Sequence, residues 1–161
     1  MRRRTVLSVC LLLPFVMLVS GFGYGVGDGL DRKQLREMLV QMGYTVSDLD
    51  KSAGSEKYAV TVQRGGLNIP VALEISANGN FIWLTVNLGM AKPDNAAYNY
   101  GLLKKNADIQ PYQFYITKSD KLMMGFPMAN QGITNSALKD RLDGIVDKVV
   151  ETQKDWSAPT T

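Results

Sequence analysis

Histidine is absent from this chain of 161 residues, and cysteine occurs only once. Without histidine, the chain has no imidazole to ligate a metal ion, to activate a serine or cysteine nucleophile, or to change charge near neutral pH. These absences exclude the commonest catalytic triads and zinc sites. We therefore expect a protein that is not an enzyme and that carries no cofactor.

The single cysteine, Cys10, lies inside an apolar run near the start of the chain. A lipoprotein signal needs its cysteine at the cleavage site behind such a run, so this position does not indicate a lipid anchor. The rest of the chain has no thiol and therefore no disulfide bond. Its roughly 135 residues can still bury about two-thirds of their unfolded surface, which is enough for a hydrophobic core.

Beyond residue 4, the chain also has no excess of positive over negative charge. The formal net charge is +3, from 18 Lys and Arg against 15 Asp and Glu, and Arg2, Arg3 and Arg4 account for the whole excess. The remaining chain is neutral and has no basic footprint for a phosphate backbone. We therefore expect no nucleic-acid partner.

Residues 1–23 have the form of a secretory signal peptide. Arginines at 2–4 precede an apolar run at 6–19, and a stretch at 20–25 in which four of six residues are serine or glycine follows it. As a helix the run reaches about 21 Å, short of the roughly 30 Å hydrocarbon core of a membrane. The pattern predicts export to the periplasm or to the exterior.

The sequence does not fix the cleavage site, because cleavage after Ser20, Gly21 or Gly23 would each leave a small residue at the last position of the signal. An alternative is that residues 6–26 stay in place as an inner-membrane anchor, which would be the only membrane contact of the chain. The rest of the sequence divides into three predicted parts: a glycine-rich tether at 24–30, one domain at 31–156 and a frayed tail at 157–161.

The predicted domain begins with a helix. Asp31 is suited to cap its N-terminus, Gln34 completes a capping box, and Gly43 marks its end. The apolar stripe of this helix comprises Leu35, Met38, Leu39 and Met42.

After a polar loop at 47–55, alternating apolar residues predict strands, with a hairpin turn at Asn78-Gly79. Pro70 lacks a backbone donor, so we expect an edge position or a bulge there. The expected elements are strands at 58–63, 67–75 and 81–88, a helix at 93–106, strands at 113–117 and 121–126, and a final helix capped by Thr134. This order predicts an α+β sandwich in which helices pack on a mostly antiparallel sheet.

Several residues at expected core positions and turns match the pattern of a known protein family. These residues are Leu102-Leu103-Lys104-Lys105-Asn106, Phe114-Tyr115, Lys121-Leu122, Phe126-Pro127-Met128, Thr134 and Leu138. With these, the chain from Asp31 to Trp156 resembles the YbjN-like family, which is similar in fold to the small secretion chaperones of type III systems. The resemblance implies a protein-binding or chaperone-like module, a monomer or dimer, without enzyme activity.

The strand expected at 81–88 has two apolar faces and indicates a binding surface. If its even-numbered residues face the helices, Phe81 and Trp83 look out of the sheet, and exposed aromatic residues mark interfaces. We expect Tyr98 and Tyr100 to extend this surface. The alternative is that the second helix covers Phe81 and Trp83.

Five methionines suggest a second kind of site: Met38, Met42, Met123, Met124 and Met128. Methionine side chains adapt to varied ligands, so a groove between the first helix and the last hairpin would suit a small apolar ligand or a lipid. The alternative is that these side chains fill the core.

Two groups of carboxylates are expected to be ordinary surface residues rather than a cation site or an acid–base pair. One group lies along the final helix and comprises Asp140, Asp143, Asp147 and Glu151. The other is scattered and comprises Asp48, Asp50, Glu56 and Glu74.

The leading hypothesis is an exported, non-enzymatic module that binds a protein partner, or a second copy of itself, through a sheet face and the second helix. The element order and the lack of catalytic residue types motivate it. The alternative, motivated by the methionines, is a small-ligand or lipid-binding envelope protein.

Overall fold

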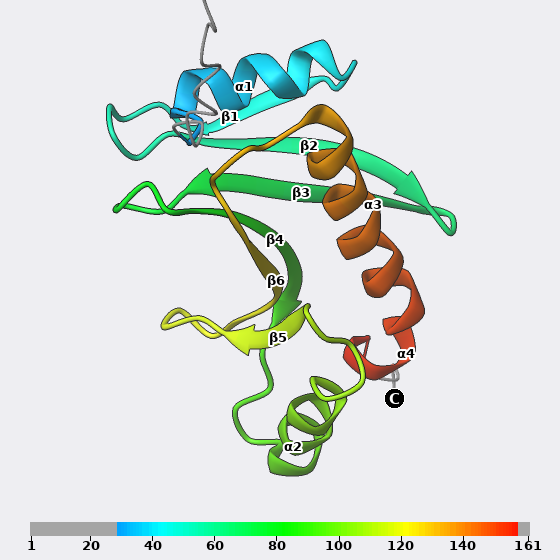
Figure 1. Ribbon diagram of the computed structural model, residues 1–161. Helices are drawn as coiled ribbons and strands as arrows, with labels where there is room; N and C mark the ends of the chain where they lie inside the picture. Colours follow the sequence, from blue (N-terminus) through cyan, green and yellow to red (C-terminus); the bar gives the residue numbers. More distant parts are fainter. Residues whose placement is uncertain (1–28, 158–161) are drawn as a thin grey trace, which may run out of the picture.

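The computed structural model describes residues 29–157 (Figure 1). Its elements are α1 (Arg32–Gln41), β1 (Val46–Asp50), β2 (Lys57–Arg64), β3 (Leu67–Ile75), β4 (Phe81–Met90), α2 (Ala96–Lys105), β5 (Gln113–Ile116), β6 (Lys121–Ala129), α3 (Asn135–Glu151) and α4 (Gln153–Trp156). The predicted signal peptide, most of the predicted tether and nearly all of the predicted tail lie outside the described residues. None of the helices within 29–157 is long and apolar enough to cross a membrane.

The six strands form one sheet in the order β1-β2-β3-β4-β6-β5, and every neighbouring pair is antiparallel. The predicted α+β class is therefore confirmed. β6 lies between β4 and β5, so the second hairpin joins the sheet through its second strand. Figure 1 shows β4 bending strongly as it crosses the sheet.

The strand β1 contradicts the polar loop that we expected at 47–55. It pairs with β2, and a bulge near Leu49 interrupts the register. Only Val46 and Asp50 of this edge strand are even partly buried, so the apolar alternation that identifies a strand is missing from its sequence.

Pro70, which has no backbone N–H to donate, lies at a position where β3 has a free edge. β3 is paired with β2 along nearly its whole length, but β4 pairs only with the stretch Ala72–Ile75. Pro70 therefore lies where one side of β3 has no neighbouring strand, as predicted for an edge position.

The helices α1 and α3 start at the capping residues that the sequence predicts. The Asp31 carboxylate accepts a hydrogen bond from the Gln34 backbone N–H at 2.8 Å, and the Gln34 side chain accepts one from the Asp31 N–H at 2.8 Å. The Thr134 hydroxyl accepts from the Ala137 N–H at 3.1 Å. The second helix differs from the prediction, because Asn95 rather than Pro93 provides its start.

One face of the sheet is covered by helices. Alternate residues of the strands point into a single core with α1 and α3, and among the described residues the members of this core run from Leu30 to Trp156. Fully buried members from different elements are Leu39, Leu73, Leu84, Met124 and Leu142. The other side chains of the strands lie on the opposite face, which we call the open face.

The short helices close the end of the core beyond β5. The Tyr98 hydroxyl of α2 donates to the Trp156 carbonyl oxygen at 2.7 Å, and the Trp156 indole N–H donates to the Val149 carbonyl oxygen at 2.9 Å. These bonds hold α2 against α4, at the bottom of Figure 1, and away from the open face.

Candidate partner-binding surface

A row of small side chains crosses the open face at right angles to the strands. In an antiparallel sheet, paired residues lie on the same face as immediate neighbours. The pairings link one residue from each strand: Ser47, Ala59, Ala72, Thr85, Gly125 and Gln113. Only Gln113, at the β5 edge, has a side chain larger than threonine. We call this row the trough.

Larger side chains stand on both banks of the trough. Each bank is a second row of cross-strand neighbours, two residues away from the trough on each strand. One bank comprises Lys57, Glu74, Trp83 and Pro127. The opposite bank includes Asn87, Met123 and Tyr115. With strands about 4.8 Å apart, the row spans roughly 24 Å, and the Tyr115 ring covers it at Gly125, so its open stretch runs from Ser47 to Thr85.

A hollow lies between the aromatic residues of the two banks. Trp83 and Glu74 from one bank and Tyr115 from the other line this hollow of about 410 Å³, together with Thr85 and Gln113. A surface that combines aromatic area with a few polar groups is typical of recognition sites.

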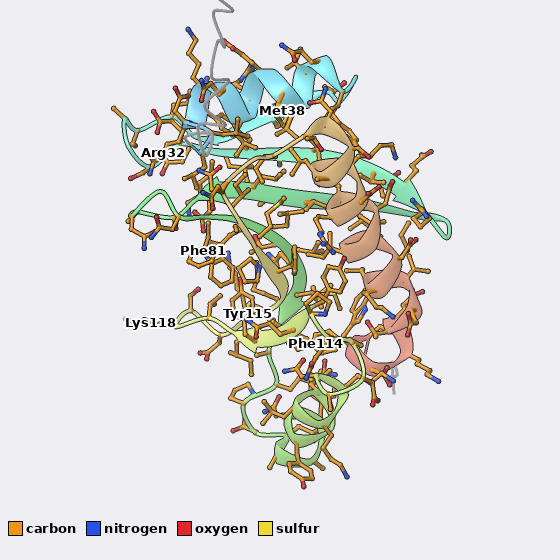
Figure 2. All side chains as sticks on the ribbon, viewed as in Figure 1. Arg32, Met38, Phe81, Phe114, Tyr115 and Lys118 are labelled. Atoms are coloured by element: carbon orange, nitrogen blue, oxygen red, sulfur yellow. The ribbon has the colours of Figure 1, made fainter. Side chains whose placement is uncertain are left out.

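Gly125 makes the position of the Tyr115 ring possible. A Cβ atom on Gly125 would lie 2.8 Å from Cε1 of Tyr115, which is closer than real contacts allow. The absence of a side chain therefore lets the ring lie over the β6 backbone. Figure 2 shows Tyr115 on the same side of β4 as Phe81, whereas Phe114 lies nearer to α3.

The charges of this surface are few and paired. Lys57 and Glu74, which are cross-strand neighbours, form an ion pair. Burial raises the pKa of the Tyr115 phenol, and the negative charge of Glu74 raises it further. Tyr115 is therefore a neutral hydrogen-bond donor at physiological pH, and the hollow is suited to a neutral, partly apolar ligand segment.

Phe81 and Trp83 lie on the open face, as the alternation of β4 predicts. Phe81 is 43% exposed and Trp83 is partly exposed. The second helix packs on α4 and does not cover them.

Tyr98 and Tyr100 do not extend this surface, so that part of the predicted site is wrong. Tyr98 is tied to Trp156 through its hydroxyl, and Tyr100 is exposed on the outer side of α2. The physical reason is the position of α2, which lies beyond the β5 edge. The four aromatic residues therefore belong to separate parts of the molecule.

The five methionines do not line one groove. Met124 and Met128 are buried in the core, whereas Met123 points to the open face. Met38 and Met42 are partly buried where α1 packs against the core. Successive residues of a strand face opposite sides, so Met123 and Met124 cannot share a groove. The alternative that most of these side chains fill the core describes the structure better.

Sequence reasoning missed Tyr115, Gln113 and Gly125 as parts of the candidate site. The sequence predicts a hairpin of 113–117 with 121–126, but it does not predict that β6 lies beside β4. The register that places Gly125 between Thr85 and Gln113 joins residues far apart in the chain. Only the alternation within 113–116 indicated that Tyr115 and Phe114 face opposite sides.

The acidic residues of α3 are mostly engaged in ion pairs at its surface. Arg64 reaches Asp143 at 3.0 Å and Asp147 at 2.6 Å, and Lys148 lies 2.5 Å from Glu151. Within residues 29–157, no three acidic or thiol side chains gather as a metal site.

The scattered acidic group is also held in local pairs. Asp48 accepts a hydrogen bond from Arg36 at 2.8 Å, and this bond lowers the pKa of the Asp48 carboxyl. Glu56 lies 3.4 Å from Arg32. These contacts join α1 to β1 and to the loop before β2, and they serve no visible chemistry.

Comparisons with known proteins give a likeness in structure and none in sequence. No protein-family model matches this chain, and no curated protein matches it. Among solved structures, the chain is similar to one in the heterodimeric complex ExoU–SpcU from the type III secretion system of Pseudomonas aeruginosa, with a TM-score of 0.48 and 16% identity over 71% of this chain and 93% of that chain. At this level the likeness does not say what the present chain binds, and membership of the YbjN-like family stays a prediction.

Proposed function

We propose that this protein is an exported, non-enzymatic, chaperone-like module that holds a segment of a partner protein on its open face. One observation carries the proposal: the helices pack on a single face of the sheet and leave the trough, with Trp83 and Tyr115 on its banks, uncovered. Export rests on the form of residues 1–23.

The trough suits an extended or helical segment that crosses the strands. Its small floor lets a partner backbone come close, and the aromatic side chains on the banks offer contact area, which dominates interface energetics. The backbone groups of the inner strands are already paired within the sheet, so recognition depends on side chains.

The β5 edge is less suited to a partner strand, because Asn106 already occupies it. The Phe114 N–H donates to Asn106 Oδ1 at 2.7 Å, and Asn106 Nδ2 donates to the Phe114 carbonyl oxygen at 3.1 Å. The asparagine amide thus takes the place of a neighbouring strand. A blocked edge favours docking on the open face over strand addition.

The test is capture of the partner from cells. The chain is expressed with its own signal and a tag behind Thr161, and proteins that co-purify from the envelope fraction are identified. We expect Trp83→Ala and the trough-blocking Ala72→Arg to lose the partner. The matched aromatic control, Tyr100→Ala, lies outside the trough and should keep it.

Retention of the partner by folded Trp83→Ala and Ala72→Arg variants would disprove the site. Recovery of a second copy of this chain alone, lost in the same variants, would identify the occupant as self. Mass spectrometry of the purified N-terminus and cell fractionation test the export: an intact N-terminus in the cytosolic fraction would contradict it.

A further inference from the structure

The end of the molecule formed by α2 and the β5–β6 hairpin collects exposed apolar side chains. Four large ones protrude there: Met90 (66% exposed), Tyr100 (63%), Leu103 (65%) and Ile116 (44%). The other large apolar side chains exposed within residues 29–157 are Val40 on α1, Leu49 on β1 and Phe81 at the opposite end of β4 from Met90.

Tyr100, Leu103 and Ile116 lie on α2 or beside it, and Met90 lies near the hairpin tip, on the side of the sheet that it shares with Lys121. Leu103 and Ile116 line the same hollow of about 330 Å³, whose lining is mostly apolar. Met90 is the cross-strand neighbour of Lys121, and the adjoining Ala91 N–H donates to the Asp120 carbonyl oxygen at 2.7 Å. Tyr100 precedes Leu103 by one turn of α2.

Four lysines lie at this end of the molecule, and we call the lysines and the four apolar residues together the α2 end. They are Lys92, Lys104, Lys118 and Lys121. Within the described part of the chain, none of the four forms an ion pair, whereas the neighbouring Lys105 is engaged by Asp108 and Asp155. Lys104 lies over the Tyr100 ring at 5.4 Å, and Figure 2 shows Lys118 at the tip of the hairpin.

The charge of the α2 end decides what can cover it. Asp94 and Asp120 are the acidic residues within 90–104 and 116–121, so the lysines outnumber them there. A symmetric dimer through this surface would set the same lysines against each other, because a two-fold interface brings one patch against itself. The charge therefore favours an anionic occupant, and that occupant must accept protruding apolar side chains.

We propose that the α2 end docks on an anionic lipid membrane surface. A fluid surface accepts protruding Leu, Ile, Met and Tyr side chains without a matching pocket, and lysines beside them reach the lipid phosphates. Each lysine near such a surface adds affinity. This contact is distinct from the predicted anchor at 6–26, and it does not include Trp83 or the other residues of the hollow beside it.

The experiment uses the chain from Gly29 to Thr161. This chain retains every core residue found in the described part of the structure, and it omits the apolar run at 6–19, whose own lipid affinity would mask the effect. Sedimentation is measured with vesicles of phosphatidylcholine alone and with roughly one-third phosphatidylglycerol. We expect binding only to the anionic vesicles, and weaker binding as salt increases.

Variants locate the contact. Each of Lys104→Ala, Lys118→Ala and Lys121→Ala should weaken binding roughly fivefold, and Leu103→Ser with Ile116→Ser should weaken it roughly tenfold or more. The matched controls lie on β1 and just behind it, at the opposite edge of the sheet: Leu49→Ser, whose side chain is 58% exposed, and Lys51→Ala. All these side chains are at the surface, so the variants should stay folded.

Three results would overturn the proposal. The first is no binding, or equal binding to both kinds of vesicle. The second is an equal loss in the β1 controls. The third is self-association without vesicles that the α2-end variants abolish, which would identify a second copy as the occupant. None of these results bears on Trp83 and the trough.

Discussion

The two faces of one sheet differ in what their residues do. On the helix-covered face, β4 contributes Ile82, Leu84 and Val86, all of which are buried against the helices. On the open face, the same strand contributes Phe81, Trp83 and Thr85, which remain exposed or partly exposed. A strand alternates between faces, so stability and recognition can be carried by neighbouring residues of one segment.

The comparison also explains why a chain without an internal disulfide bond can keep aromatic residues at its surface. The core is complete on the helix-covered face, so the open face is not needed to hold the fold. Variants on the two faces should therefore have separable effects, on unfolding and on partner binding respectively.

The largest effect is expected for Leu84→Ala. Leu84 is fully buried, and its truncation leaves a cavity, so the free energy of unfolding should fall by about 2–5 kcal/mol in urea denaturation. The neighbouring Thr85→Ala, on the open face, should change it by less than about 1 kcal/mol. Equal losses for the two variants would contradict the division between faces.

Gly125→Ala should have the next largest effect. The added methyl group must displace the Tyr115 ring, so we expect a loss of about 1–3 kcal/mol and a change in the hollow beside Trp83. The double variant with Tyr115→Ala removes the clash. Its unfolding free energy should then exceed the value expected from adding the two single effects, and strict additivity would disprove the contact.

Asn106→Ala tests the closed edge of the sheet. The change removes both hydrogen bonds to the Phe114 backbone, and we expect the unfolding free energy to fall by about 1 kcal/mol. Asn106→Asp keeps the acceptor and loses the donor, so hydrogen exchange at the Phe114 amide should be faster in Asn106→Ala than in Asn106→Asp. The same rate in both would rule out this role.

The smallest effect is expected at the surface of the helix-covered side. The hydrogen bond from Arg36 depresses the pKa of Asp48 in the folded state. Its stabilising contribution is therefore complete above the ordinary carboxyl pKa of about 3.9, and it is lost as the pH falls through the lower folded value.

The measurement is the Tm of the wild type and of Asp48→Asn at several pH values. The Tm difference between them should be small at neutral pH, because the pair is exposed to solvent, and it should shrink further under acid conditions. A difference that grows as the pH falls would show that the sign is wrong.

Several local features could be predicted because their causes lie within a few residues. The capping box of Asp31 and Gln34, the stop at Gly43 and the hairpin turn at Asn78-Gly79 all depend on short-range geometry. The alternation of β4 placed Phe81 and Trp83 on the face opposite Leu84. These features establish the helices, most strands and the α+β class.

Other features depend on contacts between distant parts of the chain. β1 has no apolar alternation and is a strand because β2 offers its edge. Tyr98 and Tyr100 lie away from Trp83 because α2 packs on α4, and Met124 is buried because β6 enters the sheet beside β4.

The residue pattern of this chain establishes which side chains of a strand share a face, since that follows from the backbone repeat of two. It does not establish which strands become neighbours, since long-range pairing sets the order and the register. The trough, the position of Tyr115 over Gly125 and the separate α2 end all arise from that pairing. They exist only once β6 lies between β4 and β5.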